Sequence, residues 1–333
     1  MLKVQSGLCG IRFRVSEQAL QENTTSIGII GAGMAGLSCA RRLAHAGIQP
    51  TILDKGRGLG GRLATRRTDN GLQFDHGAQY VTGRDASFRS LLAEMEEAGC
   101  CGRWTVEGKE RAVGAPGMNT MAKHLARGLE IRQRAEVSGL QQTANGWEVS
   151  IAGQRMHFAR LVVTIPAPQV AALLGQTHEL SQRVSCVRML PCLTLMAAFA
   201  SGAPEPFVTR RDPDDPIAWI ALDSSKLGRM TEACWVAQAG PNWSAARLDL
   251  DPADIADQML DLLCDRIGVS RSSAIHAVAH RWRYASVAEA LGAPFVRNEE
   301  ASLYLGGDWC LQGRVEAAWK SGTAIAGDLI ANF

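Results

Sequence analysis

The sequence lacks the features that mark nucleic-acid-binding and membrane-spanning proteins. Its 35 Lys and Arg residues are almost matched by 33 Asp and Glu residues, which leaves a net charge of +2. A nucleic-acid partner would require a basic stripe to hold its phosphates. The longest apolar run, residues 190–200, is too short to cross a bilayer. We therefore expect neither a nucleic acid nor a membrane as partner.

The sequence also lacks the cysteine patterns of metal and redox sites. No CxxC pair occurs, and no His/Cys spacing is typical of a metal site. The adjacent Cys100 and Cys101 suit neither a usual disulfide nor a tetrahedral metal site. The nine cysteines are an odd number and no secretory segment is recognisable, so we expect free thiols in a reducing cytoplasm and no metal. For Cys310 a small buried residue is favoured over a redox role. Residues 1–25 are expected to form a poorly ordered leader.

What the sequence does contain is a glycine-rich segment typical of a dinucleotide site. The apolar run at residues 26–30 predicts a buried strand, and the apolar spacing of residues 34–46 predicts a helix. Between them, Gly31 allows a sharp turn and Gly33 lets the backbone approach a pyrophosphate, while Gly36 lets the helix pack closely on the strand. The helix N-terminus carries partial positive charge, which suits phosphate.

An acidic residue follows in the expected place. Residues 51–53 predict a second strand, and Asp54 at its end can accept hydrogen bonds from ribose hydroxyls. Further glycines then lead to Arg62, which could neutralise the pyrophosphate. For Arg66 and Arg67, phosphate binding and a solvated turn are about equally compatible with the sequence.

A second glycine motif lies at the other end of the chain. Residues 302–306 predict a buried strand that ends at Gly307 and Asp308, and Gly313 precedes a helix with one clear apolar face. Two such segments so far apart in sequence indicate that the dinucleotide is FAD rather than NAD.

The two motifs together resemble the glutathione-reductase-type FAD fold and, within it, the flavin amine oxidase superfamily. Four segments are similar to the renalase family, particularly its bacterial branch: 74–80, 113–118, 279–285 and 307–316. The resemblance covers nearly all of residues 26–333.

The resemblance implies an FAD-dependent oxidase of small molecules. Renalases oxidise the 2- and 6-dihydro isomers of NAD(P) to NAD(P)+ by hydride transfer to flavin N5, and O2 is reduced to H2O2. A flavin-containing amine or polyamine oxidase is the alternative, and an FAD-binding protein without turnover is a second one. Arg314 occupies the place where the amine oxidases often have an aromatic cage residue, which weakens the amine interpretation. No cysteine lies in residues 280–284, so we expect non-covalent FAD.

The resemblance also gives roles to single residues. It places Asp308 against the ribityl-pyrophosphate part of FAD and Val137 against the adenine. It points the N-terminus of the last helix at the flavin pyrimidine edge, where Arg314, Val315 and Glu316 act mainly through backbone N–H groups. The predicted cofactor-binding residues are Gly31, Gly33, Met34, Ala35, Gly36, Asp54, Lys55, Gly61, Arg62, Gly77, Ala78, Gln79, Val137, Gly307, Asp308, Arg314, Val315 and Glu316.

Candidates for the substrate face of the flavin come from the same segments. On a strand, His280, Trp282 and Tyr284 share one face, which suits the wall of a pocket for a flat ring. Strand packing is an equal alternative for each of them, and His76 is also compatible with a structural role. We assign no acid or base. The candidates are His76, Gln79, His280, Trp282, Tyr284 and Arg314.

The predicted fold is α/β: a Rossmann-type FAD domain with an α+β substrate domain built on a mixed sheet. Residues 26–84, 112–170 and 279–333 are assigned to the FAD domain, and residues 85–111 and 171–278 to the substrate domain. Nothing in the sequence separates a monomer from a weak dimer.

Overall fold

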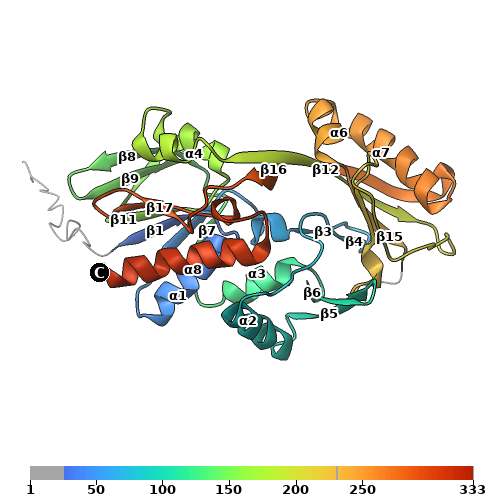
Figure 1. Ribbon diagram of the computed structural model, residues 1–333, viewed down its shortest axis with the longest axis horizontal. Coiled ribbons are helices and arrows are strands. Elements are labelled where there is room, and N and C mark those ends of the chain that lie inside the picture. The colour runs from blue at the N-terminus through green and yellow to red at the C-terminus, as the bar shows by residue number, and fades with distance from the viewer. Residues whose placement is uncertain (1–25, 230–231, 333) are drawn as a thin grey trace, which may run out of the picture.

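A computed structural model describes residues 26–229 and 232–332 (Figure 1). The predicted leader, residues 1–25, lies outside the described residues. Two sheets occupy opposite ends of the molecule, and the long strands β12 (Arg188–Phe199) and β16 (Ala274–Glu289) run from one end toward the other.

The first sheet carries both glycine motifs. Its six strands are ordered β17-β18-β11-β1-β2-β7, and all neighbouring pairs are parallel except β17 with β18. The central strand β1 pairs with β11 on one side and β2 on the other, which is the Rossmann arrangement predicted from the sequence. The strands are β1 (Ile27–Ile30), β2 (Thr51–Asp54), β7 (Glu130–Gln133), β11 (Arg160–Val163), β17 (Val296–Arg297) and β18 (Leu303–Leu305).

Helices α1 (Met34–His45) and α8 (Val315–Ala331) lie side by side against this sheet (Figure 1). They come so close that a Cβ on Gly322 would lie 2.0 Å from the carbonyl oxygen of Ala35. The Arg42 side chain donates to the carbonyl oxygen of Thr323 over 3.1 Å. The first and last helices of the sheet layer are therefore in backbone contact.

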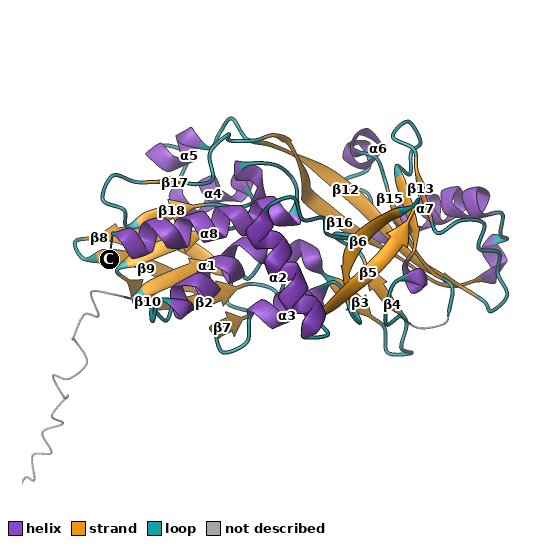
Figure 2. Ribbon diagram, turned by 60° about the horizontal axis from the view of Figure 1, so that its bottom comes forward, coloured by secondary structure: helices purple, strands orange, loops and turns teal. Residues whose placement is uncertain are grey.

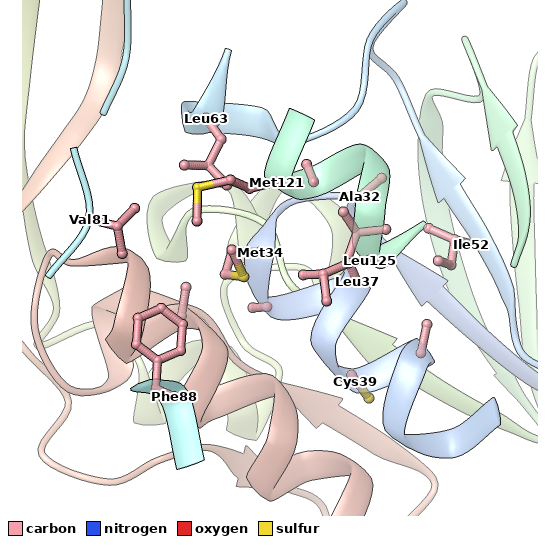
Figure 3. Close-up of a cluster of buried hydrophobic side chains, with 14 of the residues drawn as sticks. Ala32, Met34, Leu37, Cys39, Ile52, Leu63, Val81, Phe88, Met121 and Leu125 are labelled. Atoms are coloured by element: carbon pink, nitrogen blue, oxygen red, sulfur yellow. The ribbon is translucent and has the colours of Figure 1, made fainter. Parts of the chain in front are cut away.

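Helices α2 (Ala86–Glu97) and α3 (Asn119–Leu125) share the hydrophobic core of α1. Figure 3 shows Leu37 of α1, Phe88 of α2 and Met121 of α3 in one cluster. Phe88 also packs on Trp319 of α8 with ring centroids 5.2 Å apart. We assigned residues 85–111 to the substrate domain; because of this shared core, we propose that α2 packs as part of the FAD domain.

The hairpin of β5 (Cys101–Val106) and β6 (Lys109–Gly114) follows α2 and lies toward the second sheet (Figure 2). Trp104 donates from its indole nitrogen to Ser225 over 3.1 Å. A separate antiparallel sheet covers the other end of the Rossmann sheet, and its β8–β9 hairpin turns at residues 144–145. It consists of β8 (Val137–Thr143), β9 (Gly146–Ile151) and β10 (Gln154–Phe158), followed by helices α4 (Ala167–Leu174) and α5 (Glu179–Arg183).

The second large sheet is antiparallel, in the order β13-β14-β15-β12-β16. A hydrophobic cluster joins one face of it to α7 (Pro252–Ile267), whose N-terminus is capped by Asp251. The remaining elements are β13 (Thr209–Arg211), β14 (Trp219–Leu222), β15 (Cys234–Gln238) and α6 (Pro241–Ala246).

The strand β16 pairs with β12 from Ala274 to Glu289. The domain boundary that we predicted at residue 279 therefore falls inside a continuous strand. We propose that the FAD domain resumes after residue 289, because strand pairing holds the whole of β16 in the second sheet.

Candidate active site

The turn between β1 and α1 and the first residues of α1, together residues 31–36, form an open concave surface, which we call the cradle. Gly31 has φ of +106°, a value that favours glycine. A Cβ on Gly36 would lie 1.9 Å from the carbonyl oxygen of Gly31, so only glycine permits this turn. No side chain caps the N-terminus of α1, and no atom lies within 4 Å of the place where a Cβ on Gly33 would stand. The open N–H groups and the free space suit a phosphate group.

A second glycine segment forms one wall of this cradle. The N–H of Gly60 donates to the carbonyl oxygen of Ala32 over 2.9 Å. Gly61 follows, and a Cβ on it would lie 3.6 Å from the Cα of Gly33. Met34 and Ala35, also predicted cofactor residues, are buried in the first turn of α1.

Asp54 lies at the carboxyl end of β2, beside the cradle. Its two carboxylate oxygens accept N–H groups from Ala32 at 2.6 Å and from Gly56 at 2.7 Å. The N–H of Ala135 donates to the carbonyl oxygen of Asp54 over 2.9 Å. The buried Val137 follows two residues later. Lys55 is exposed next to Asp54. The predicted ribose and adenine contacts therefore lie along one edge of the sheet.

Arg62 and Asp308 join the two glycine motifs directly. The guanidinium donates to both carboxylate oxygens, over 2.6 and 2.8 Å, and also to the carbonyl oxygen of Ala285 over 3.1 Å. Such forked ion pairs fix the orientation of both partners. The Asp308 side chain is 7% exposed and that of Arg62 is 30% exposed. The N–H of the preceding Gly307 bonds Ser321 of α8 over 2.9 Å.

The N-terminus of α8 is likewise without a side-chain cap, and the half-buried Arg314 immediately precedes Val315. We predicted mainly backbone roles for this turn, and the Glu316 side chain has a further one. It is buried, and its carboxylate accepts the N–H groups of Arg84 at 2.9 Å and Asp85 at 2.6 Å. Glu316 thus ties the start of α8 to the loop that enters α2.

The loop at residues 76–79 is fixed from both domains. The N–H of Ala78 bonds the carbonyl oxygen of Arg62 over 2.8 Å. Gln238 of β15 donates its side-chain amide to the carbonyl oxygen of Gly77, also over 2.8 Å. Gln79 is buried and donates to the carbonyl oxygen of Asp75 over 2.5 Å. The loop therefore joins the cofactor motif to the second sheet.

Three of the predicted substrate-face residues form one aromatic cluster. Ring centroids of His76 and His280 are 4.8 Å apart, those of His280 and Trp282 are 4.3 Å apart, and His76 stacks on Trp282 at 5.4 Å. The Trp282 indole nitrogen donates to the carbonyl oxygen of His76 over 2.8 Å. Tyr284, two residues further along β16, is half-buried.

Both imidazoles of this cluster are neutral at pH 7. Burial lowers the pKa of His76 to about 4, and the neighbouring His280 and Arg66 add to this effect. Burial also lowers the pKa of His280 to about 4, again with help from Arg66. The arginines that alternate with the aromatic residues bond elsewhere: Arg281 donates to the carbonyl oxygen of Leu250 over 2.5 Å, and Arg283 to Asp249 over 3.0 Å.

Sequence reasoning missed a buried group of four charges beneath the loop at 76–79. The side chains of Asp75, Asp223, Lys226 and Arg229 are all 0–1% exposed. The Lys226 amine lies 2.5 Å from Asp223 and donates to Gln79 over 3.2 Å, while Arg229 bonds Asp75. Burial acts to raise the pKa of Asp75, but Lys226 and Arg229 outweigh it and hold that pKa below its usual range. Asp223, Lys226 and Arg229 are close in sequence, but only folding brings the distant Asp75 to them, so the sequence did not signal the group.

The family model for flavin-containing amine oxidoreductases matches residues 98–330, and a model of an NAD(P)-binding Rossmann-like domain matches residues 29–95. The chain belongs to the flavin-containing amine oxidoreductase family. Its cofactor is therefore FAD and its chemistry is oxidoreduction. Single proteins also resemble it in sequence or in fold.

The chain is 35% identical to a 15-cis-phytoene desaturase of Synechococcus elongatus over 69 residues, which are 21% of this chain and 15% of the desaturase. The crystal structure of an Exiguobacterium sp. 255-15 protein assigned as a protoporphyrinogen oxidase matches with a TM-score of 0.75 at 12% identity, over 93% of this chain and 99% of that one. A putrescine oxidase bound to putrescine matches with a TM-score of 0.70 at 13% identity, over 92% and 99%. These structural matches show a shared fold.

The residues present fit FAD. The uncapped α1 and the open space at Gly33 would hold the pyrophosphate, Asp54 would hold the ribose, and Asp308 with the α8 N-terminus would hold the flavin half. Among the described residues, no group of His, Cys, Asp and Glu could hold a metal ion. No helix in the described ranges is long and apolar enough to span a bilayer.

Proposed function

We propose that the protein is an FAD-dependent oxidase that converts the 2- and 6-dihydro isomers of NAD(P) to NAD(P)+. The observation that supports this most is the His76–His280–Trp282 cluster, which offers aromatic rings for packing but no strong base. A dihydropyridine needs no base, because the lone pair of its ring nitrogen drives hydride loss. Alignment of the two rings is then the main task of the protein.

FAD, when bound, accepts the hydride and passes its electrons to O2, which yields H2O2. The chain itself holds and orients. Trp282 and His280 would stack near the nicotinamide ring, and the loop at residues 76–79 would fix the distance between this wall and the cofactor. The positive end of α8 would stabilise negative charge on the pyrimidine edge.

We also propose that the protein is cytoplasmic and acts as a monomer or a weak dimer. Each of the eight cysteines in the described ranges is free, as expected in a reducing compartment. Cys310 is buried and burial raises the pKa of its thiol to about 12, which supports a packing role.

An amine or polyamine oxidase is the alternative function. Membership of the amine oxidoreductase family and the fold shared with putrescine oxidase favour it. An FAD-binding protein without turnover is the remaining one.

Anaerobic mixing of the purified holoprotein with single reductants separates these functions. We expect 2- and 6-dihydroNAD(P) to bleach the visible flavin absorbance rapidly, while ordinary NADH, the 4-dihydro isomer, serves as the matched control. Bleaching by putrescine or benzylamine instead would establish the amine oxidase. If FAD remains bound but no donor reduces it, the protein is a non-catalytic flavin binder.

A further inference from the structure

We propose that Arg66 is the centre of an anion-binding subsite, completed by His76, His276 and His280, which takes a phosphate group of the substrate. We call these four residues the Arg66 subsite. The identity of the substrate as a dinucleotide rests on the proposed function, whereas the subsite itself can be tested apart from it.

The backbone register brings the four residues together. Arg66 on β3 (Thr65–Arg67) lies directly opposite Phe74 on β4 (Gln73–Asp75). Residues opposite one another in an antiparallel pair share a face of the sheet. The Phe74 ring stacks on His276 with centroids 5.4 Å apart, and His276 shares its face of β16 with His280. His76, which follows β4, meets His280 edge to face at 4.8 Å.

The subsite contains polar groups that the described residues leave unsatisfied. The Nδ1 of His76 and the Nε2 of His276 are buried without a hydrogen-bond partner. His76 as a whole is only 6% exposed. A buried polar group without a partner is costly, and native proteins rarely leave one without a reason. Polar ligand atoms bound at these two nitrogens would remove that cost.

Arg66 also differs from two other arginines near the site, Arg62 and Arg229. Arg62 is paired with Asp308 and Arg229 with Asp75. Within the described ranges, no carboxylate forms an ion pair with Arg66. The half-buried guanidinium therefore contributes a positive charge that no acidic side chain neutralises.

The charge of Arg66 acts on each imidazole of the subsite. Burial is the first cause that lowers the pKa of His76, His276 and His280, and Arg66 lowers each of them further. At pH 7 the subsite thus combines one fixed positive charge with neutral imidazole rings, each of which has a single N–H to donate. This favours a phosphate and disfavours the ammonium group of an amine. A forked guanidinium is well matched to phosphate oxygens.

Titration of the holoenzyme with inorganic pyrophosphate tests the subsite, with calorimetry as the readout. FAD fills its own phosphate cradle in the holoenzyme, so binding there does not interfere. We expect R66Q to weaken pyrophosphate binding about 10- to 100-fold, the usual worth of charge-assisted hydrogen bonds. R67Q is the matched control, because Arg67 is the exposed neighbour on the opposite face of β3, and it should bind as the wild type does.

Kinetics provide the second readout. R66Q should raise the KM for the dihydronucleotide by a similar factor and change kcat by less than about threefold, because the subsite acts in binding rather than in hydride transfer. His276→Asn removes one donor and leaves Arg66 in place. It therefore tests the Arg66 subsite even if R66Q does not retain FAD. It should weaken pyrophosphate binding about 3- to 10-fold.

The two proposals fail in different ways. Pyrophosphate binding that R66Q and His276→Asn leave unchanged, in an enzyme that turns over dihydronucleotides, overturns the subsite but not the function. Pyrophosphate binding that depends on Arg66, in a protein that dihydronucleotides do not reduce, overturns the function and leaves the subsite.

Discussion

Gly322 lies where α8 touches the first turn of α1, and Gly322→Ala tests how closely cofactor binding depends on this contact. The added Cβ would lie 2.0 Å from the carbonyl oxygen of Ala35 and 2.8 Å from its carbonyl carbon. Backbone atoms cannot rotate away as a side chain does, so one helix must move by more than 1 Å, the difference from an ordinary contact. Ala35 belongs to the turn that forms the phosphate cradle.

The magnitude follows from two opposing effects. Overpacking costs up to about 3 kcal/mol, whereas Gly to Ala in a helix gains about 1 kcal/mol. We therefore expect Gly322→Ala to lose about 2 kcal/mol of unfolding free energy. Gly327→Ala, in the same helix, is the control. Its Cβ would meet only the end of the flexible Arg42 side chain, at 3.3 Å, so we expect it to be neutral or to gain up to about 1 kcal/mol.

Urea unfolding of both variants measures the difference in unfolding free energy. The rise in FAD fluorescence when the cofactor is released on dilution measures cofactor retention. Gly322→Ala should release FAD more readily than both Gly327→Ala and the wild type. Equal stability and equal FAD retention in the two variants would refute the idea that the α1–α8 contact sets the shape of the cradle.

Three further predictions concern charged groups. Asp308→Asn should lower the unfolding free energy in urea by about 1–2 kcal/mol, because it removes the charge from a forked but partly exposed ion pair; an unchanged midpoint would show that the pair contributes nothing. Folding holds the pKa of His76 and His280 at about 4, below that of the unfolded chain. The unfolding free energy should therefore be highest above about pH 6.5 and fall as the pH drops toward 4. His280→Asn should flatten this pH profile between pH 7 and pH 5, and a profile as steep as that of the wild type contradicts the assignment. Glu316→Ala leaves two N–H groups unpaired, so hydrogen exchange at residues 84–85 should accelerate, while no change there would show that the carboxylate does not hold this loop.

The elements next to the glycine motifs could be predicted because their signals are local. The strand expected at residues 26–30 is Ile27–Ile30, and the helix expected at residues 34–46 is Met34–His45. In each case a short apolar run or a helical spacing, bounded by glycine, is sufficient. The last helix, Val315–Ala331, was predicted on the same grounds.

The limits of the second domain could not be predicted in the same way. The pairing of β16 with β12 joins residues about 90 positions apart, and no local pattern shows where it ends. Likewise, Phe88 meets Trp319 only because α2 and α8 pack on one core. Contacts of this kind depend on tertiary packing, which single-sequence periodicity does not record.

The sequence left two interpretations for Arg66, phosphate binding and a solvated turn, because it does not record how strands pair. Whether a residue of a short strand faces a pocket or solvent depends on register, since one step reverses the face. The structure pairs Arg66 with Phe74, and Phe74 stacks on His276, a contact that no local sequence pattern records. Lys226 carried no sequence signal, because Asp75, which it neutralises, lies far away in the chain.

The link between Arg62 and Asp308 has a consequence for biosynthesis. A growing polypeptide completes β1, α1 and β2 early, yet the aspartate that orients Arg62 is added 246 residues after it. Until residues 303–331 leave the ribosome, β11 pairs with β1 alone and α1 lacks the helix that shields it. Capture of the coenzyme therefore has to wait for these residues, and a nascent chain stalled before this point would expose apolar surface to chaperones and proteases.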